Sequence, residues 1–317
     1  MAHLEELRLM ARVAHLYYNQ GLSQSEIAKR LDLSQTTISR LHKRAIAEKI
    51  IRITVSMPPG VYVELEEALR QKYNIKDVII ADSQSQRLDD LQRAIGAAAA
   101  YYIETTLGKD EVVGISSWSS TLLAMVDAMH PVNSKINAQI VQILGGIGNS
   151  EAEKHAARLG HRLAELLHGT AVFLSAPGIV GSADAKRVLL EDPYVAQTVA
   201  MFDQVTLALV GIGALEPSEL LASSGNTFSS DETQVLRECG AIGDICQRFF
   251  DADGQPVDTP LNDRVIGMPL AQLKNIRRTV AVAGGAHKVK AIRGALVGGI
   301  VNVLVTDQAT AQALIDD

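Results

Sequence analysis

Three stretches of the sequence place small hydroxyl and glycine residues directly after a short apolar run. They read VVGISSWSSTLLAM (112–125), VQILGGIGNSEAEKHAARL (141–159) and VAVAGGAHKVKAI (280–292). Each has the pattern of a strand, a Gly/Ser loop and the start of a helix. In a parallel sheet such loops lie at the carboxyl edge, where α/β folds bind ligands. Because helix N-termini attract phosphate, the three loops together predict a site for a polar small molecule or its phosphate.

The first stretch supplies most of the candidate ligand groups. Its tryptophan is the only one in the chain and could lie against the face of a sugar ring. The alternative is that its serines cap a helix and the tryptophan belongs to the core. The candidate effector contacts here are Ser116, Trp118, Ser119, Ser120 and Thr121.

The second stretch offers glycines and a histidine. Gly145 and Gly146 would let the backbone come close to a ligand, and His155 follows on the predicted helix. A lone histidine on a helix is more often a surface or core residue, so both roles stay open for it. His155, His161 and His168 lack the spacing of four residues that a metal-binding pair needs on a helix. We therefore expect no metal site.

Two charged residues complete the predicted site. Lys288 in the third stretch falls in the first turn of the expected helix, where a cation opposes the helix dipole. An anionic ligand would compensate it; otherwise Lys288 is a solvated surface lysine. Asp244 lies in GAIGDIC, an apolar, glycine-rich setting in which a carboxylate needs hydrogen-bond donors. Sugar hydroxyls could supply them, and a structural cap is the alternative.

Short apolar runs alternate with helical segments over most of the chain. This alternation predicts an α/β fold with a mostly parallel sheet covered on both faces. The runs are DVIIAD (77–82), EVVGIS (111–116), QIVQIL (139–144), TAVFLS (170–175), VTLALVGIG (205–213), RTVAVAGG (278–285) and VNVLVTD (301–307).

The N-terminal region predicts a helix-turn-helix. Apolar residues recur at helical spacing over 3–19, Ser23 and Glu26 form a capping box for a second helix, and Ser34 caps a third that runs to about Lys49. Side chains of the third helix suit base edges and phosphates. The alternative is a helical packing or dimerisation element with a solvated face. The expected DNA contacts are Ser34, Gln35, Thr36, Thr37, Ser39, Arg40, Lys43 and Arg44.

Composition and charge divide the chain in two. The 317 residues, 47% of them hydrophobic, can bury a large core. Residues 1–55 hold nine Lys/Arg and five Asp/Glu, a net charge of +4, whereas the whole chain has −6 and the remainder therefore −10. The run SMPPG (56–60) interrupts the pattern. We expect a winged-type helix-turn-helix domain at 1–56, with a strand at 50–55, and a larger ligand-binding domain at 57–317.

The sequence also indicates a cytoplasmic protein. Its start, MAHLEELRLM, is charged and amphipathic rather than a signal peptide. No apolar run reaches the ~18 residues that span a bilayer, so we expect no membrane association. Cys239 and Cys246 fit two inert thiols in a reducing compartment. We expect no cofactor.

These motifs resemble a known family. YYNQGLSQSEIAKRLDLSQTTISRLHKRA (17–45) resembles the N-terminus of SorC/DeoR-type sugar-binding bacterial transcriptional regulators. Longer and more specific blocks resemble that family's C-terminal effector domain. They are GAIGDICQRFFDADGQPV (240–257), LNDRVIGMPLAQL (261–273) and VAVAGGAHKVKAIRGALVGGIVNVLVTDQATAQALI (280–315).

The resemblance implies an effector domain similar in fold to sugar-phosphate isomerases, in a homo-oligomer, a dimer or tetramer, that binds operator DNA. It implies effectors that are phosphorylated sugars, or in some members free sugars or polyols, with contacts at His155, Asp244 and Lys288. The family pattern has Gly and Arg where this chain has Ser119 and Ser120. The usual phosphate contact is therefore in question, which leaves room for a free sugar or polyol.

We therefore expect a transcriptional regulator of a carbohydrate operon, a repressor whose operator binding is relieved by a sugar, polyol or sugar phosphate. The alternative is a sugar-phosphate isomerase-like enzyme with an accessory helical domain. That enzyme would need a carboxylate base opposite a ring-opening acid, and only Asp244 and Lys288 are candidates. A protein–protein adaptor that uses residues 1–55 is a weaker third alternative.

Overall fold

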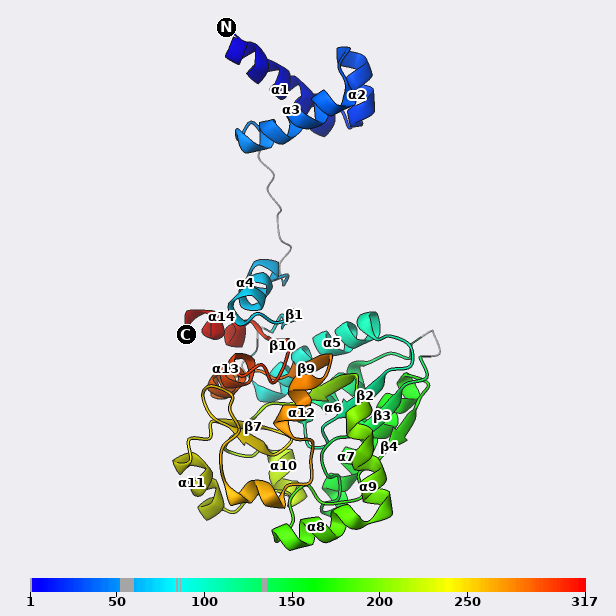
Figure 1. Ribbon diagram of the computed structural model, residues 1–317, viewed down its shortest axis with the longest axis vertical. Helices are drawn as coiled ribbons and strands as arrows, with labels where there is room; N and C mark the ends of the chain where they lie inside the picture. Colours follow the sequence, from blue (N-terminus) through cyan, green and yellow to red (C-terminus); the bar gives the residue numbers. More distant parts are fainter. Residues whose placement is uncertain (1, 52–59, 84, 86, 133–135) are drawn as a thin grey trace. The chain divides into compact units, whose positions relative to one another are not determined.

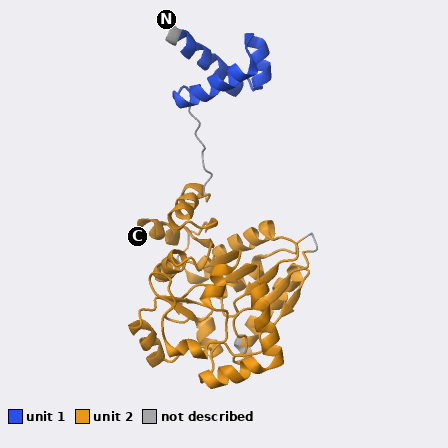
Figure 2. Cartoon of the chain, in the orientation of Figure 1, with its two compact units in different colours: residues 1–58 blue, residues 59–317 orange. Residues whose placement is uncertain are grey.

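The structure, a computed structural model, describes residues 2–51, 60–83, 85, 87–132 and 136–317. The chain divides into two compact units, Met1–Pro58 and Pro59–Asp317 (Figure 2). Each unit has a hydrophobic core of its own. Most of the strand predicted over 50–55 lies outside the described residues.

Over residues 2–51 the N-terminal unit contains three helices, as the sequence predicts. Ser23 and Glu26 form the expected capping box, Asp32 ends the second helix in the left-handed conformation at φ 55°, and the Ser34 hydroxyl accepts the N–H of Thr37 at 3.1 Å. These caps fix the turn between the second and third helices. The helices are α1 (Ala2–Tyr18), α2 (Gln24–Leu31) and α3 (Gln35–Ala47).

The larger unit is built on a seven-stranded sheet in which every described pairing is parallel. All seven predicted runs form its strands, so the prediction of a mostly parallel sheet is confirmed. In spatial order the strands are β1 (Asp77–Ala81), β10 (Val303–Asp307), β9 (Arg278–Val282), β5 (Leu207–Val210), β2 (Val112–Ile115), β3 (Gln139–Gln142) and β4 (Thr170–Val172).

Helices cover both faces of this sheet (Figure 1). Successive strand residues alternate between two cores: Leu207 and Leu209 belong to one, Ala208 and Val210 to the other. The first core includes α5 (Leu88–Thr106), α6 (Ser120–Ala128) and α7 (Ser150–Leu166). The second includes residues of α4 (Val63–Tyr73), α8 (Ala183–Glu191), α9 (Pro193–Ala200), α10 (Glu219–Ser224), α12 (Leu270–Asn275), α13 (Val289–Val297) and α14 (Gln308–Asp316).

A small antiparallel sheet, which the sequence did not predict, lies in the same unit. It consists of β6 (Gly213–Ala214), β7 (Gly243–Ile245) and β8 (Arg248–Phe250), and α11 (Ser230–Glu238) precedes β7. Cys246 and Gln247 form the two-residue turn between β7 and β8, with φ of 53° and 60°. Both angles lie in the left-handed region, which asparagine and glycine usually occupy in such turns.

The beginning of the larger unit contacts the residue that follows the edge strand β1. The Tyr62 hydroxyl donates to Asp82, the residue after β1, at 2.7 Å, and it lies 3.2 Å from Gln308. The Asp82 carboxylate also occupies the space that a Cβ on Gly60 would need. These contacts place Gly60 and Tyr62 beside the end of the strand that precedes α5.

Candidate effector pocket and DNA-binding helix

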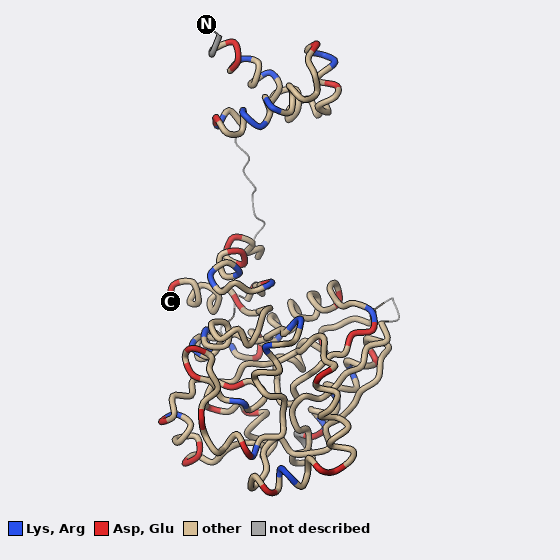
Figure 3. Tube along the Cα trace, in the orientation of Figure 1, with Lys and Arg blue, Asp and Glu red and all other residues tan. Residues whose placement is uncertain are grey.

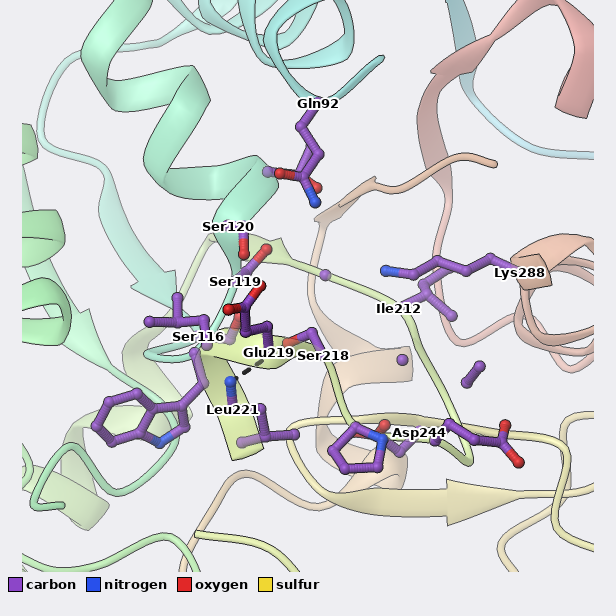
Figure 4. A pocket seen from close by; sticks show the side chains of 18 of the residues that line it. Gln92, Ser116, Ser119, Ser120, Ile212, Ser218, Glu219, Leu221, Asp244 and Lys288 are labelled. Atoms are coloured by element: carbon purple, nitrogen blue, oxygen red, sulfur yellow. Dashed lines mark hydrogen bonds between the residues drawn. The ribbon is translucent and has the colours of Figure 1, made fainter. Parts of the chain in front are cut away.

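A pocket of about 630 Å³ lies at the carboxyl ends of the parallel strands. Its wall comes from the loops after β2, β5 and β9, the N-terminal part of α5 and the β7–β8 turn (Figure 4). This is the edge at which α/β sheets bind ligands. Seven of the predicted effector residues line it: Ser116, Trp118, Ser119, Ser120, Thr121, Asp244 and Lys288.

The serine loop is held in place by hydrogen bonds to the neighbouring loop. Ser117 donates to the Leu144 carbonyl at 2.7 Å, and Trp118 Nε1 donates to the Gly145 carbonyl at 2.9 Å. The Trp118 ring is 6% exposed, so it is a wall of the pocket and a part of the core at once. Ser119 caps α6 by accepting the N–H of Leu122 at 3.2 Å.

Three hydroxyls of this loop remain available to a ligand. The described residues offer no hydrogen bond to the side chains of Ser116, Ser120 or Thr121, although Ser116 and Thr121 are buried. These hydroxyl oxygens are not among the fully buried unpartnered polar atoms of the described residues, so a ligand hydroxyl or an ordered water in the cavity can reach them. The serine cluster therefore combines a helix cap with free donors.

Gly145, Gly146 and His155 do not belong to the residues that line the pocket. A Cβ on Gly145 would lie 2.3 Å from the Pro177 backbone, and one on Gly146 would lie 2.6 Å from the Gln142 carboxamide. The glycines thus permit close packing behind the pocket wall. His155 is half-buried on α7.

Asp244 lies on β7 at the floor of the pocket and is 8% exposed. Its Oδ2 accepts the backbone N–H of Gln247 at 3.0 Å, and its Oδ1 lies over Gly213, where a Cβ would be 2.0 Å away. Burial raises the pKa of Asp244 to about 6, and the Gln247 N–H and the charge of Lys288 oppose that rise. At neutral pH the pocket therefore holds a buried carboxylate with free acceptor capacity.

Lys288 ends the 3-10 turn Ala286–Lys288 and caps α13. The sequence analysis placed it in the first helical turn; it lies one position earlier. Figure 4 shows its ammonium group reaching into the cavity from the side opposite the serines. Burial lowers the pKa of Lys288, and Asp244 opposes this shift. Over the described part of the chain no carboxylate lies within ion-pair distance of its Nζ.

The second candidate site is α3 of the N-terminal unit. Gln35, Thr36, Arg40 and Lys43 are exposed, and no described residue hydrogen-bonds or ion-pairs with their side chains. Figure 3 shows basic and no acidic residues along this helix. Exposed donors on the second helix of a helix-turn-helix are suited to the major groove.

Three of the other predicted DNA contacts, Ser34, Thr37 and Arg44, have partners within the protein. The hydroxyls of Ser34 and Thr37 lie 2.8 Å apart, and Ser39 is half-buried. Arg44 pairs with Glu6 of α1 and with Glu48, the latter at 2.9 Å. On α3, Gln35, Thr36, Arg40 and Lys43 are therefore free to contact DNA. Ser34, Thr37 and Arg44 instead contact other residues of the same unit.

Comparison with known proteins assigns both units of the chain to known domain types. Residues 58–316 match the family model described as "Putative sugar-binding domain", and residues 10–48 match the model described as "Sigma-70, region 4". The chain is 33% identical to the deoxyribonucleoside regulator of Bacillus subtilis (strain 168), and the match covers 99% of both chains. The chain belongs to this family of sugar-binding transcriptional regulators.

A solved structure supports the same assignment for this regulator. The full-length sorbitol operon regulator SorC from Klebsiella pneumoniae superimposes with a TM-score of 0.75 at 28% identity, over 98% of this chain and 99% of that one. The curated sorbitol operon regulator of Klebsiella pneumoniae is 28% identical over 99% of this chain. The resemblance stated from the motifs is confirmed.

Several residues that line the pocket of the regulator were not predicted from the sequence. The loop after β5, GIGALEPSEL (211–220), is a fourth strand–loop–helix segment and supplies Ser218 and Glu219. Its glycine and serine content was a usable signal. Gln92 on α5 and Gln247 in the β7–β8 turn had no such signal, because glutamines are common on protein surfaces.

The described residues contain neither a candidate metal site nor a membrane-spanning helix. Among them no group of three or more His, Cys, Asp or Glu could hold a metal ion. None of their helices is long and apolar enough to cross a membrane.

Proposed function

We propose that this chain is a transcriptional regulator that binds operator DNA through α3 and a small polyhydroxylated effector in the pocket of its larger unit. It acts in the cytoplasm on a carbohydrate-related operon. The observation that carries the proposal is the presence, in one chain, of a free basic helix face and a pocket with unpartnered hydroxyls. We expect repression by the effector-free form, in a dimer or tetramer that matches a two-fold operator.

The mechanism we propose is linkage between the two sites. The effector binds one conformation or assembly state more tightly, and the operator binds another. The two binding free energies are then coupled, so the effector weakens DNA binding by the factor by which DNA weakens effector binding. The relatives described as deoxyribonucleoside and sorbitol operon regulators support this class of effector.

An isomerase-like enzyme is the alternative. Asp244, with a pKa raised to about 6, and Lys288, with a lowered pKa, are the groups that such chemistry could use. The free basic face of α3 has no role in that reaction. The relatives are transcriptional regulators, which supports a binding protein.

Fluorescence anisotropy of a labelled duplex from the gene's own upstream region tests the proposal. The full chain is titrated at two salt concentrations, and sugars, polyols and sugar phosphates are then added one by one. Salt-sensitive binding that one compound releases supports the regulator. No binding at low salt, together with isomerase turnover of any tested sugar phosphate, supports the enzyme.

A further inference from the structure

Carboxylates outnumber cations among the described residues that line the pocket. Lys288 offsets Asp244, and Glu216 is engaged with Arg237 at 2.7 Å. Burial lowers the pKa of His287, which keeps this ring uncharged at neutral pH. Among the described residues of the wall, the carboxylates left without a cation are Asp89 and Glu219.

Besides the start of α13, where Asp244 offsets the charge of Lys288, the N-terminus of α6 would attract an anion in this wall. Its first turn contains no acidic residue, and Ser120 and Thr121 present free hydroxyls there. The first turn of α5, by contrast, already holds Asp89 and Asp90. Unopposed N–H groups beside hydroxyls usually favour a phosphate, so whatever faces this end of α6 decides whether a phosphate is accepted there.

Glu219 faces this end of α6. It is the first residue of α10, and Figure 4 shows its side chain directed from α10 toward Ser119 and Ser120. No hydrogen bond or ion pair joins its carboxylate to another described residue of the wall. The negative charge that α6 lacks in its own first turn is thus supplied by a different helix of the protein.

We propose that Glu219 makes this pocket select uncharged sugars or polyols and reject their phosphate esters. The inference rests on the proposed function, because it assumes that the pocket is the effector site. A phosphate beside the Glu219 carboxylate would meet a like charge, which is strongly unfavourable. A hydroxyl at the same place donates to Glu219 and accepts from Ser120 or Thr121, so a neutral polyol satisfies both partners.

The single tryptophan makes the test direct. Trp118 lines the pocket, so its emission reports binding to the full-length protein. The probes are matched pairs: D-ribose and D-ribose 5-phosphate, D-fructose and D-fructose 6-phosphate, and D-glucitol and D-glucitol 6-phosphate. The variants are Glu219→Gln and, as control, Asp231→Asn, which removes one negative charge from an exposed position in the first turn of α11, outside the residues that line the pocket.

For the wild type we expect the neutral member of the bound pair to bind about tenfold or more tightly than its ester. Glu219→Gln should raise the affinity for the ester by about tenfold, whereas Asp231→Asn should leave the ratio of the two affinities unchanged. Circular dichroism confirms that both variants fold. Tighter binding of the ester by the wild type, or an equal shift in both variants, overturns the role of Glu219.

The operator assay separates this inference from the proposed function. Release of operator DNA by an ester would leave the regulator intact and refute the selection by Glu219. Failure of every probe both to change Trp118 emission and to release operator DNA would count against the proposed function and this inference together.

Discussion

The backbone N–H of Gln247 donates to Oδ2 of Asp244 at 3.0 Å across a two-residue turn whose members both have positive φ. The turn thereby supplies a donor to a carboxylate that is otherwise buried at the pocket floor. Left-handed conformations at residues other than glycine are costly and persist where surrounding structure fixes them. Here the turn fixes the orientation of Asp244, so its carboxylate is already in position at the floor of the pocket.

Asp244→Asn should weaken effector binding by about 2 kcal/mol, because hydrogen bonds to a charged acceptor contribute about that much. Titration of Trp118 emission with the effector measures the loss. Asp258→Asn, a change at an exposed position, is the matched control and should have no effect. Equal affinities of wild type and Asp244→Asn would remove Asp244 from the site.

The same residue predicts a pH dependence of stability. Burial raises the pKa of Asp244 from 3.8 to about 6, so the folded state holds this proton more tightly than the unfolded state. Its contribution to stability is therefore full below about pH 4 and is lost as the pH rises through 6, by up to about 3 kcal/mol. Urea unfolding followed by Trp118 should show Asp244→Asn gaining stability over the wild type at pH 7 and not at pH 4.

Lys288→Met should abolish the effector response and leave operator affinity within about 0.5 kcal/mol of the wild type. The methionine keeps the volume and removes the ammonium group that reaches into the pocket. Lys290→Met, at an exposed position two residues along the chain, is the control. Anisotropy of the operator duplex with and without effector measures both quantities, and a full response of Lys288→Met would refute this placement.

Arg40→Ala should weaken operator binding by about 1–3 kcal/mol and relax its sequence preference, because Arg40 is exposed and unpaired on α3. Arg44→Ala should act mainly on stability, since Arg44 pairs with Glu6 and Glu48. Anisotropy with operator and scrambled duplexes distinguishes the two. If Arg44→Ala alone changed the sequence preference, the division of α3 into free and paired residues would be wrong.

Gly145→Ala should destabilise the larger unit by about 1–3 kcal/mol, the usual cost of overpacking, because its Cβ would lie 2.3 Å from the Pro177 backbone. Gly181→Ala is the control, since a Cβ there meets nothing within 4 Å. Urea unfolding measures both. Unchanged stability with lost effector affinity would instead assign Gly145 to ligand contact.

The parallel sheet was predictable because its strands are continuous apolar runs that alternate with helices. The antiparallel sheet was not, since Gly213–Ala214 and Gly243–Ile245 are too short to show a period. For α1, sequence spacing alone favours the series Leu4, Leu7, Ala11, Ala14 and Tyr18. The structure instead buries Met10, Val13 and Leu16, because periodicity does not specify which apolar face the other helices will cover.

The site was predictable to the extent that single loops carry it. The serine loop shows hydroxyls beside a helix start, so Ser116 and Ser120 could be identified directly. Gly145 shows the limit of this reasoning: a glycine required for packing and a glycine required for ligand approach look alike in a sequence. The selectivity proposed for Glu219 could not be predicted from the sequence. It depends on the N-terminus of α6, which only the fold brings close to α10 (Figure 4).

The hydrogen bond from Tyr62 to Asp82 joins the start of the larger unit to the chain segment that leads to the pocket. Tyr62 is among the first described residues after the division between the two units, and Asp82 follows β1. The chain then continues to α5, whose residues Asp89 and Gln92 line the pocket. Asp82, which accepts the hydrogen bond from Tyr62, is thus only seven residues before Asp89 and ten before Gln92 in the wall of the pocket.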